Sequence, residues 1–464
     1  MKRTKIIATL GPATEKKETL LKMVDAGMNI ARLNFSHGSY DEFKNIVQTL
    51  RLVEAESGHL ISIMQDLQGP KIRLGEIPEE KMLVSRGDII TFCTKKGVKG
   101  TVHVPYSALP KVVKRGQRLL IEDGLIRTKI LSTSGDKVRA KVVSGGYLKS
   151  HKGINIPETR LPASAALTVK DRKDLKFGVQ TLKVDAIAVS FVESAEDIIR
   201  VRKEIAKYTS RRIHIVAKIE RAEALKNLEQ IIDVTDGVMV ARGDLGIETK
   251  AEKVPIAQRK MIALARVKGK PVIVATQILQ SMVSSPIATR AEVSDAATAI
   301  FELADAFMLS NETAVGQYPV QAVKTLARVA KATEAEIFRN QELAPTATTI
   351  PSMQEDGAIA LNACVLAENL DARAIVVMTE SGFTAAQVLK NRPKIPVIAI
   401  TKDEFIAHKL NFLWGIEKII VKKGAYRSED MKNQLKKDGT LKPGEKVIFV
   451  KLSDKKRSLV ALDV

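Results

Sequence analysis

The sequence has few cysteines and no long apolar run. Only Cys93 and Cys364 occur in 464 residues, and they lie far apart without CxxC spacing, which argues against a disulfide framework or a zinc site. No apolar run approaches the roughly 20 residues of a membrane-spanning helix. The apolar run at residues 6–10 is too short for the core of a signal peptide. We therefore expect a folded chain in the cytoplasm, with no membrane partner.

Aromatic residues are also scarce, at 4% of the chain, while the net charge is +21. Residues 71–166 alone hold 19 Lys or Arg against 8 Asp or Glu, a balance that attracts polyanions. Nucleic acid is one candidate, but the basic residues are scattered rather than clustered with side chains on which bases could stack. A phosphorylated small molecule suits the charge equally well.

Eight short apolar runs, each ending in polar or charged residues, are the dominant pattern, and most are followed by a stretch of helical period. Parallel strands joined by helices in eight repeats predict a closed (β/α)8 TIM barrel, in which reactive groups gather at the carboxyl ends of the strands. The predicted strands are residues 4–11, 28–36, 60–68, 185–192, 214–221, 237–246, 271–279 and 305–312.

A long gap separates the third predicted strand from the fourth. Residues 72–160 are rich in Val, Thr and Gly with repeated turn signals, which predicts a small β-barrel domain inserted above the barrel mouth as a hinged lid. An insertion without a functional role is the alternative. The predicted domains are a barrel of residues 1–70 and 164–340, a lid of residues 71–163, and a C-terminal domain of residues 341–464.

The C-terminal part follows a Pro- and Thr-rich segment, residues 344–352, that is typical of a linker. Apolar strands then alternate with helices, which predicts a small open α/β sheet. Its last two strands, residues 446–452 and 459–464, are placed to form a hairpin across residues 453–457.

Charge on the fifth predicted strand marks the candidate site. Lys218 and Glu220 share one face and stand ~6–7 Å apart along the strand, so a barrel would direct both into its mouth. A structural ion pair is the alternative. Asp244 adds a second carboxylate at the next strand end, and two carboxylates suit Mg²⁺. Gly243 lets an anion approach backbone amides at a helix start.

Other strand ends add cations and hydrogen-bonding groups. Any one of them could be a helix cap or a rim ion pair, but together with the carboxylates they favour an anionic, phosphorylated substrate bridged by a metal ion. These residues are Arg32, Asn34, Ser36 and His37 after the second strand, Asp66, Lys71 and Arg73 after the third, and Thr276 and Gln277 after the seventh.

Several strings of residues, taken in order and spacing, resemble the pyruvate kinases from end to end. The resemblance implies a barrel with an inserted lid and a regulatory C-terminal domain. It further implies Mg²⁺-dependent phosphoryl transfer from phosphoenolpyruvate to ADP, giving pyruvate and ATP in the last step of glycolysis, by a homotetramer. The strings are NIARLNFSHG at 29–38, AKIE at 217–220, MVARGDLG at 239–246, VATQ at 274–277, TRAEVSD at 289–295 and LSNETA at 309–314.

The resemblance also implies roles for the residues that match the family's motifs. Glu220 and Asp244 would ligate the Mg²⁺ or Mn²⁺ ion. Lys218 would stabilise charge on the transferring phosphoryl group and on the departing enolate oxygen, while Arg32 would hold the phosphoryl group. These two cations and the metal would supply the charge neutralisation that phosphoryl transfer needs.

The same resemblance extends to the substrate carboxylate and the nucleotide. Gly243, Asp244 and Thr276 would hold the carboxylate, and Thr276 would lie near the path of proton delivery without itself being assigned as the acid. Lid closure would exclude water from the reacting groups. The positions that match nucleotide contacts are Asn34, His37, Arg73 and Lys152 of the lid.

One departure from the family concerns a monovalent cation. Many members hold K⁺ through residues matching Asn34, Ser36 and Asp66 plus a threonine, with a glutamate shortly afterwards. Here the last two positions are Leu67 and Lys71. An ammonium group can take the place of a monovalent cation, so we expect Lys71 to fill the pocket and the activity not to require K⁺. A solvent-facing Lys71 is the alternative.

A second departure concerns regulation. Members activated by fructose 1,6-bisphosphate use a serine-rich phosphate loop and a later glycine-rich loop, whereas this chain has Glu380 and Phe383 within residues 379–384 and a charged segment at 453–457. We expect no activation by that sugar, which leaves room for another phosphorylated effector. The alternatives to a kinase are a metal-dependent barrel lyase or aldolase acting through an enolate, and a basic nucleic-acid-binding protein.

Overall fold

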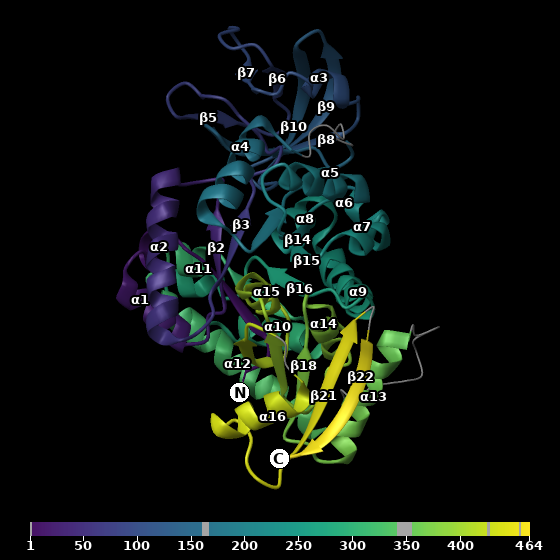
Figure 1. Ribbon diagram of the computed structural model, residues 1–464. Coiled ribbons are helices and arrows are strands. Elements are labelled where there is room, and N and C mark those ends of the chain that lie inside the picture. The colour runs from purple at the N-terminus through teal and green to yellow at the C-terminus, as the bar shows by residue number, and fades with distance from the viewer. Residues whose placement is uncertain (1, 160–166, 341–354, 425–426, 454–455) are drawn as a thin grey trace.

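The computed structural model describes residues 2–159, 167–340, 355–424, 427–453 and 456–464. Figure 1 shows three stacked bodies: a β domain at one end, a barrel in the middle and a mixed domain that holds the C-terminus at the other end. The predicted linker, residues 344–352, and the middle of the predicted turn at 453–457 lie outside the described residues. The domain boundaries at 163/164 and 340/341 fall next to or within such gaps and stay predictions.

The central body is a closed barrel of eight parallel strands, as predicted. Alternation sends one set of side chains outward, under the helices, and the other set into the barrel. The interior set includes Ile7, Met64, Val216 and Met239. In sequence order the strands are β1 (Lys5–Thr9), β2 (Ile30–Asn34), β3 (Ser62–Asp66), β13 (Ala186–Val189), β14 (His214–Ile219), β15 (Gly237–Ala241), β16 (Val272–Ala275) and β17 (Ala306–Leu309).

Helices surround the barrel and several begin at side-chain caps. Ser39 Oγ accepts from the Glu42 amide and Thr289 Oγ1 from the Glu292 amide, satisfying amides that a helix start leaves free. The helices are α1 (Lys17–Asp25), α2 (Tyr40–Ser57), α4 (Val169–Phe177), α5 (Ala195–Ala206), α6 (Ala222–Lys226), α7 (Leu228–Val234), α8 (Arg242–Glu248), α9 (Val254–Val267), α10 (Arg290–Phe301), α11 (Asn311–Ala314) and α12 (Pro319–Arg339).

The inserted β domain leaves the barrel after β3 and returns before α4. A seven-stranded sheet and a two-stranded ribbon enclose one apolar core that includes Phe92 and Leu119. Apart from the parallel pair β6 and β7, these strands pair antiparallel. The elements are β4 (Ile72–Arg73), β5 (Lys81–Val84), β6 (Ile89–Cys93), β7 (Val102–His103), α3 (Leu109–Val112), β8 (Arg118–Ile121), β9 (Ile126–Ser134), β10 (Lys137–Ser144), β11 (Gly146–Lys149) and β12 (Gly153–Asn155).

Buried Arg221, just after β14, joins this domain to the barrel. Its guanidinium donates to the carbonyl oxygen of Thr159 at 2.5 Å and pairs with Glu193 at 3.0 Å. Asn155 of β12 adds a hydrogen bond of 3.1 Å to Glu248 Oε1 of α8. The lid therefore sits over the carboxyl ends of β14 and β15, beside the mouth.

The C-terminal domain is an open five-stranded sheet in the order β20, β19, β18, β21, β22. Its first four strands in this order are parallel, and β22 pairs antiparallel with β21, so the expected hairpin forms. The strands are β18 (Ala374–Met378), β19 (Val397–Thr401), β20 (Ile416–Val421), β21 (Lys446–Ser453) and β22 (Lys456–Asp463), and the helices are α13 (Glu355–Asn369), α14 (Phe383–Leu389), α15 (Glu404–Leu410) and α16 (Ser428–Lys437).

This domain closes the amino end of the barrel. Phe412, which follows α15, is 1% exposed and packs with the interior side chains of the barrel. Arg392 Nη1 pairs with Asp305 at 2.9 Å, and Ser62 Oγ donates to the His408 carbonyl oxygen at 2.7 Å. Within the described ranges, no helix has both the length and the apolar character needed to cross a membrane.

Candidate active site

Lys218 is the centre of the cluster at the barrel mouth. It lies near the carboxyl end of β14, and its ammonium reaches Asp66 Oδ1 at 3.2 Å, Glu220 Oε1 at 3.0 Å and Ser190 Oγ at 2.8 Å. Burial by itself disfavours the charged amine, but the carboxylates of Asp66 and Glu220 outweigh it and raise the Lys218 pKa above its ordinary value. The amine is therefore a fixed positive charge.

Asp66, at the end of β3, holds a second cation in place. Arg32 Nε donates to Asp66 Oδ2 at 2.7 Å, and Arg32 Nη1 donates to Thr9 Oγ1 at 2.9 Å. Burial opposes ionisation of Asp66, which is 1% exposed, yet Lys218 and Arg32 hold its pKa below the usual range. One carboxylate thus brings an ammonium and a guanidinium together.

Glu220 and Asp244 supply the acidic side of the mouth. Glu220 is buried and accepts from the Phe191 amide at 2.7 Å, while Asp244 lies partly exposed in the first turn of α8. Burial raises the Glu220 pKa, the nearby charge of Asp244 adds to that effect, and Lys218 opposes it. Because these two carboxylates repel each other, a divalent cation bound by both would stabilise them.

The described residues contain no group of three or more His, Cys, Asp or Glu side chains placed to hold a metal. A metal ion at Glu220 and Asp244 must therefore take its remaining ligands from substrate or water. This is how Mg²⁺ usually binds, because it keeps several waters or phosphate oxygens and uses one or two protein carboxylates. The donor set therefore fits Mg²⁺ or Mn²⁺.

Thr276 and Gly243 form the third part of the mouth. The Gly243 amide donates to Thr276 Oγ1 at 2.8 Å, and Thr276 has a φ of +66°, which is rare for a β-branched residue. Arg242 secures this turn by donating to the Thr276 carbonyl oxygen at 2.8 Å and pairing with Asp295 at 2.7 Å. The Thr276 hydroxyl, on this strained backbone, is thereby held beside the start of α8.

The predicted nucleotide contacts lie at the junction of barrel and lid. Arg73 of β4 donates to the His151 carbonyl oxygen at 3.1 Å, and Lys152 pairs with Glu122 at 2.8 Å within the lid.

On the barrel side, burial lowers the His37 pKa, and the neighbouring cations, Arg73 foremost, lower it further. Asn34 Oδ1 accepts from the Ser36 amide at 3.2 Å. This rim is positive, as an anionic nucleotide requires.

Lys71 lies beside the lid, and its predicted place in the monovalent-cation pocket stays a prediction. Among the described contacts its amine reaches none of Asn34, Ser36 and Asp66; its Cε would instead stand 3.1 Å from a Cβ built at Gly153 of β12. The chain turns out of the barrel at Gly69, whose φ is +66°, so Lys71 already follows the lid. Asp66 is neutralised by Arg32 and Lys218 instead.

Three contacts of this cluster were missed from the sequence. Thr9 closes β1, and Ser190 and Phe191 follow β13. The rule of polar residues at strand ends applies to Thr9 and Ser190 as well, and would have selected both had it been used on the first and fourth strands. Phe191 acts through its backbone amide, at a φ of +56°, and no pattern of residue types reveals that.

Comparisons with known proteins agree with this geometry. A family model described as pyruvate kinase, barrel domain, matches residues 1–323, and one described as pyruvate kinase, alpha/beta domain, matches residues 357–458. The pyruvate kinase of Clostridium acetobutylicum is 40% identical over 423 residues, which is 90% of this chain and 89% of that protein.

Pyruvate kinase 2 of Synechocystis sp. is 41% identical over 427 residues, covering 90% of this chain and 71% of its own. Among solved structures, a pyruvate kinase from Cryptosporidium parvum superposes with a TM-score of 0.93 at 33% identity, covering 100% of this chain and 96% of its own. The similarity therefore spans the barrel, the lid and the C-terminal domain together.

Proposed function

Because this chain belongs to the pyruvate kinase family, we propose that its barrel mouth moves the phosphoryl group of phosphoenolpyruvate to ADP, with the residue roles given below. Membership makes the chain a phosphotransferase that uses phosphoenolpyruvate, ADP and a divalent metal. The observation that carries the residue assignment is the single buried carboxylate, Asp66, that both Lys218 and Arg32 contact.

Lys218 and Arg32 bind the phosphoryl end of the substrate. Charge in this transition state is spread over phosphoryl oxygens, and positioned cations stabilise it at no cost of reorientation. The Lys218 ammonium also stabilises the enolate oxygen left behind, and its raised pKa supports this role because the amine stays charged. Asp66 is a positioning residue that acts through both cations.

Glu220 and Asp244 hold Mg²⁺, or Mn²⁺ in its place. The bound ion would supply positive charge to the phosphoryl group as that group is transferred. Gly243, Asp244 and Thr276 orient the substrate carboxylate at the start of α8, where backbone amides favour an anion. The Thr276 hydroxyl donates to the Ala275 carbonyl oxygen at 2.6 Å. In our proposal the path of proton delivery to the enolate stays near this hydroxyl, through water, and Thr276 is not assigned as the acid.

The nucleotide binds between the lid and the barrel. Asn34, His37, Arg73 and Lys152 line this junction, and the positive balance of the lid suits a polyphosphate. Closing the lid over the mouth removes water that would otherwise accept the phosphoryl group.

Independence from K⁺ remains part of the proposal, but on different grounds from the predicted Lys71 contact. Both carboxylate oxygens of Asp66 already face protein cations, and Leu67, which is 2% exposed, brings no oxygen ligand. A monovalent metal ion thus has few free donors here. We further propose a cytoplasmic homotetramer with a phosphorylated effector other than fructose 1,6-bisphosphate.

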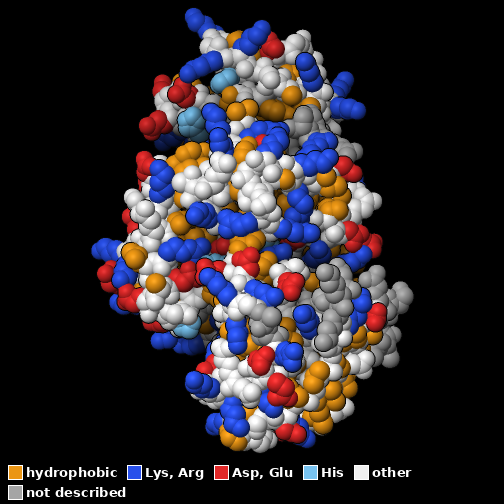
Figure 2. Space-filling view, in the orientation of Figure 1, with side chains coloured by type: hydrophobic (Ala, Val, Ile, Leu, Met, Phe, Trp, Pro, Cys, Tyr) orange, Lys and Arg blue, Asp and Glu red, His pale blue; other side chains and the backbone are white. Residues whose placement is uncertain are grey.

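The alternatives lack a supporting observation. A barrel lyase or aldolase leaves the lid cations without a role, and none of the comparisons reported above points to one. For nucleic-acid binding, a continuous basic track is expected, whereas Figure 2 shows Lys and Arg spread over all three bodies on this face, with Asp and Glu among them.

The direct test is pyruvate formation from phosphoenolpyruvate, ADP and Mg²⁺ by the purified chain and by Lys218→Met. Removing one preorganised charge at the reacting group is expected to lower kcat by roughly 10²- to 10³-fold, with a much smaller change in KM. Lys226→Met, at an exposed lysine of α6, is the matched control and should keep full activity.

Thermal unfolding of each variant separates lost chemistry from lost folding. Lys218→Met with wild-type kcat would remove Lys218 from the reaction. Absence of pyruvate formation by the folded parent chain would overturn the proposed function as a whole.

A further inference from the structure

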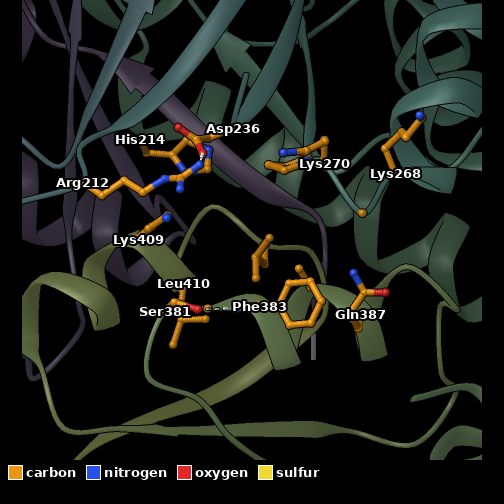
Figure 3. A pocket seen from close by; sticks show the side chains of 15 residues that line it. Arg212, His214, Asp236, Lys268, Lys270, Ser381, Phe383, Gln387, Lys409 and Leu410 are labelled. Carbon is orange, nitrogen blue, oxygen red and sulfur yellow. Dashed lines mark hydrogen bonds and ion pairs between the residues drawn. The ribbon is translucent and has the colours of Figure 1, made fainter. Parts of the chain in front are cut away.

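A cavity of about 260 Å³ lies at the end of the barrel opposite the active site. One wall comes from the barrel, at the start of β14 and around the beginnings of β15 and β16. The other comes from α14, α15 and the loop before α14 in the C-terminal domain. Figure 3 shows His214, Asp236 and Lys270 on the barrel side facing Lys409, Phe383 and Gln387.

The buried His214 in this wall has no hydrogen-bond partner in the described part of the chain. It is 3% exposed, and neither Nδ1 nor Nε2 has a partner among the described residues. Its ring stacks on Phe412 with centroids 5.2 Å apart. Burial, assisted by Lys409 and Lys270 and opposed by Asp236, lowers its pKa to about 3. A neutral imidazole with an unused N–H is a costly group unless a ligand accepts from it.

The cavity also has more positive than negative charge. Its lining holds four basic side chains, Arg212, Lys268, Lys270 and Lys409, and one acidic side chain, Asp236. Lys268 is paired outside the cavity, with Asp233 at 2.7 Å.

The one lining carboxylate does not balance the remaining cations. Asp236 is shared between Arg202 at 2.8 Å and Arg212 at 3.5 Å. Lys270 donates to the Thr235 carbonyl oxygen. The Lys409 amine feels the charge of Asp236 but makes no hydrogen bond or ion pair with another described residue. Burial, and repulsion between the cations, lower the pKa of both lysines. An anion with more than one negative charge would satisfy this surplus.

The loop before α14 does not itself offer a free anion cradle. The Gly382 amide donates to Thr379 Oγ1 at 2.9 Å, and the Phe383 amide to Ser381 Oγ at 3.4 Å. An anion in the cavity must therefore take its contacts from the barrel wall and from Lys409.

We propose that this interdomain cavity binds a small phosphomonoester. Its phosphate dianion is held by Lys409, Lys270 and Arg212 and accepts a hydrogen bond from the N–H group of His214. Three cations against one shared carboxylate suit a dianion better than a single carboxylate ligand, and the volume leaves room beside the phosphate for a small attached group. Because the walls come from two domains, the ligand joins the C-terminal domain to the barrel. Binding here needs neither the lid nor the mouth.

The test is isothermal titration calorimetry of the full chain with inorganic phosphate and with glycerol 3-phosphate. We expect a Kd of about 1 mM or lower. Lys409→Met and Arg212→Met should each weaken it by roughly tenfold or more, because each removes a charged contact. Lys260→Met, at an exposed lysine of α9, should bind as the parent does.

Phosphate at the active site is recognised by its own variant. Lys218→Met should retain the cavity binding that Lys409→Met loses. The opposite pattern, loss in Lys218→Met and retention in Lys409→Met and Arg212→Met, would place the anion at the mouth and overturn the proposal. So would no heat of binding with either probe, or failure of glycerol 3-phosphate to compete with phosphate.

His214→Phe sharpens the test. Phenylalanine keeps the stacking on Phe412 but has no N–H, so at neutral pH the variant should unfold at no lower a temperature than the parent while binding phosphate several-fold more weakly. Unchanged phosphate affinity in a folded His214→Phe would remove the imidazole from the site.

Discussion

At the carboxyl end of its barrel the protein pairs Lys218 and Arg32 with a buried carboxylate, whereas at the amino end the His214 imidazole and the Lys409 amine have no hydrogen-bond partner among the described residues. Lys218 and Arg32 share Asp66 at the mouth, while His214 and Lys409 face an interdomain cavity. The mouth is therefore ordered before any ligand arrives, and the amino end gains its missing contacts from a ligand.

The two ends also differ in what closes them. The mouth carries the lid, joined to the barrel by polar contacts of Arg221 and Asn155. The amino end is closed by Phe412 of another domain, packed among the interior residues of the barrel. A polar joint can open at modest cost, whereas a buried aromatic ring cannot be withdrawn without exposing a core. The comparison predicts motion at the mouth and a fixed contact at the amino end.

Asp66→Asn removes the carboxylate that Lys218 and Arg32 share, and it should have the largest combined effect on stability and turnover. Lys218 and Arg32 would stay buried with their common counter-charge gone, and breaking a buried pair costs about 3–5 kcal/mol of stability. Misplacement of both cations should lower kcat by roughly 100-fold. Urea unfolding and steady-state kinetics measure the two effects, with Asp233→Asn at a half-exposed site as control. An active, stable Asp66→Asn would show that the cations hold themselves in place.

Phe412→Ala removes the aromatic ring that closes the amino end of the barrel. Removing a buried phenylalanine costs about 3–5 kcal/mol through lost burial and the cavity left behind, while the mouth residues keep their contacts with one another. Urea unfolding should therefore show a large loss, and kcat at a temperature where the variant is folded should stay near the parent value. Phe301→Ala, at a site 47% exposed, should be nearly neutral. A kcat that falls with stability would indicate that the two ends are coupled.

The pH dependence of stability tests the unpartnered imidazole. The pKa of His214 is lowered from 6.5 to about 3 by burial, so between these values the unfolded chain binds the additional proton and stability falls as the pH is lowered. At pH 5 the loss is about 2 kcal/mol for this group. His214→Phe should remove that share of the slope in urea unfolding between pH 7 and 5.

Some slope should survive in that variant, because burial also lowers the pKa of His408 to about 4. His59→Phe, at an exposed histidine, should leave the slope as it is in the parent. Equal slopes in His214→Phe and the parent would mean that His214 is already protonated in the folded chain.

The smallest effect is expected from K⁺. Since Asp66 is neutralised by Lys218 and Arg32, turnover in buffer free of K⁺ and NH₄⁺ should lie within about twofold of turnover with KCl. Choline chloride at equal ionic strength is the control. A many-fold rise that KCl produces and choline chloride does not would show a monovalent cation site.

Much of the fold could be predicted because strand periodicity is local. All eight barrel strands occur where the apolar runs indicated, and the final hairpin forms as expected. The pairing within the lid could not be read in this way, since β4 lies next to β12 and β8 next to both β12 and β9. Such partners are chosen by long-range packing rather than by the residues of one strand.

The same contrast between local sequence pattern and long-range packing applies to the candidate site. Lys218 and Glu220 were found because a charge on a buried strand is conspicuous, and Arg32 and Asp244 because they follow strand ends. The surroundings of Lys71 could not be predicted, because the turn at Gly69 decides whether the next side chains belong to the barrel or to the lid.

By itself the sequence determined which residue types stand at each strand end, since that depends only on chain order and a period of two. The tertiary structure alone decided that Asp66 would serve two cations and that Phe412 would enter a barrel built by other segments. It also decided that His214 would be buried with no hydrogen-bond partner among the described residues. Each of these depends on distances between residues far apart in the chain, which are fixed only when the domains pack against one another.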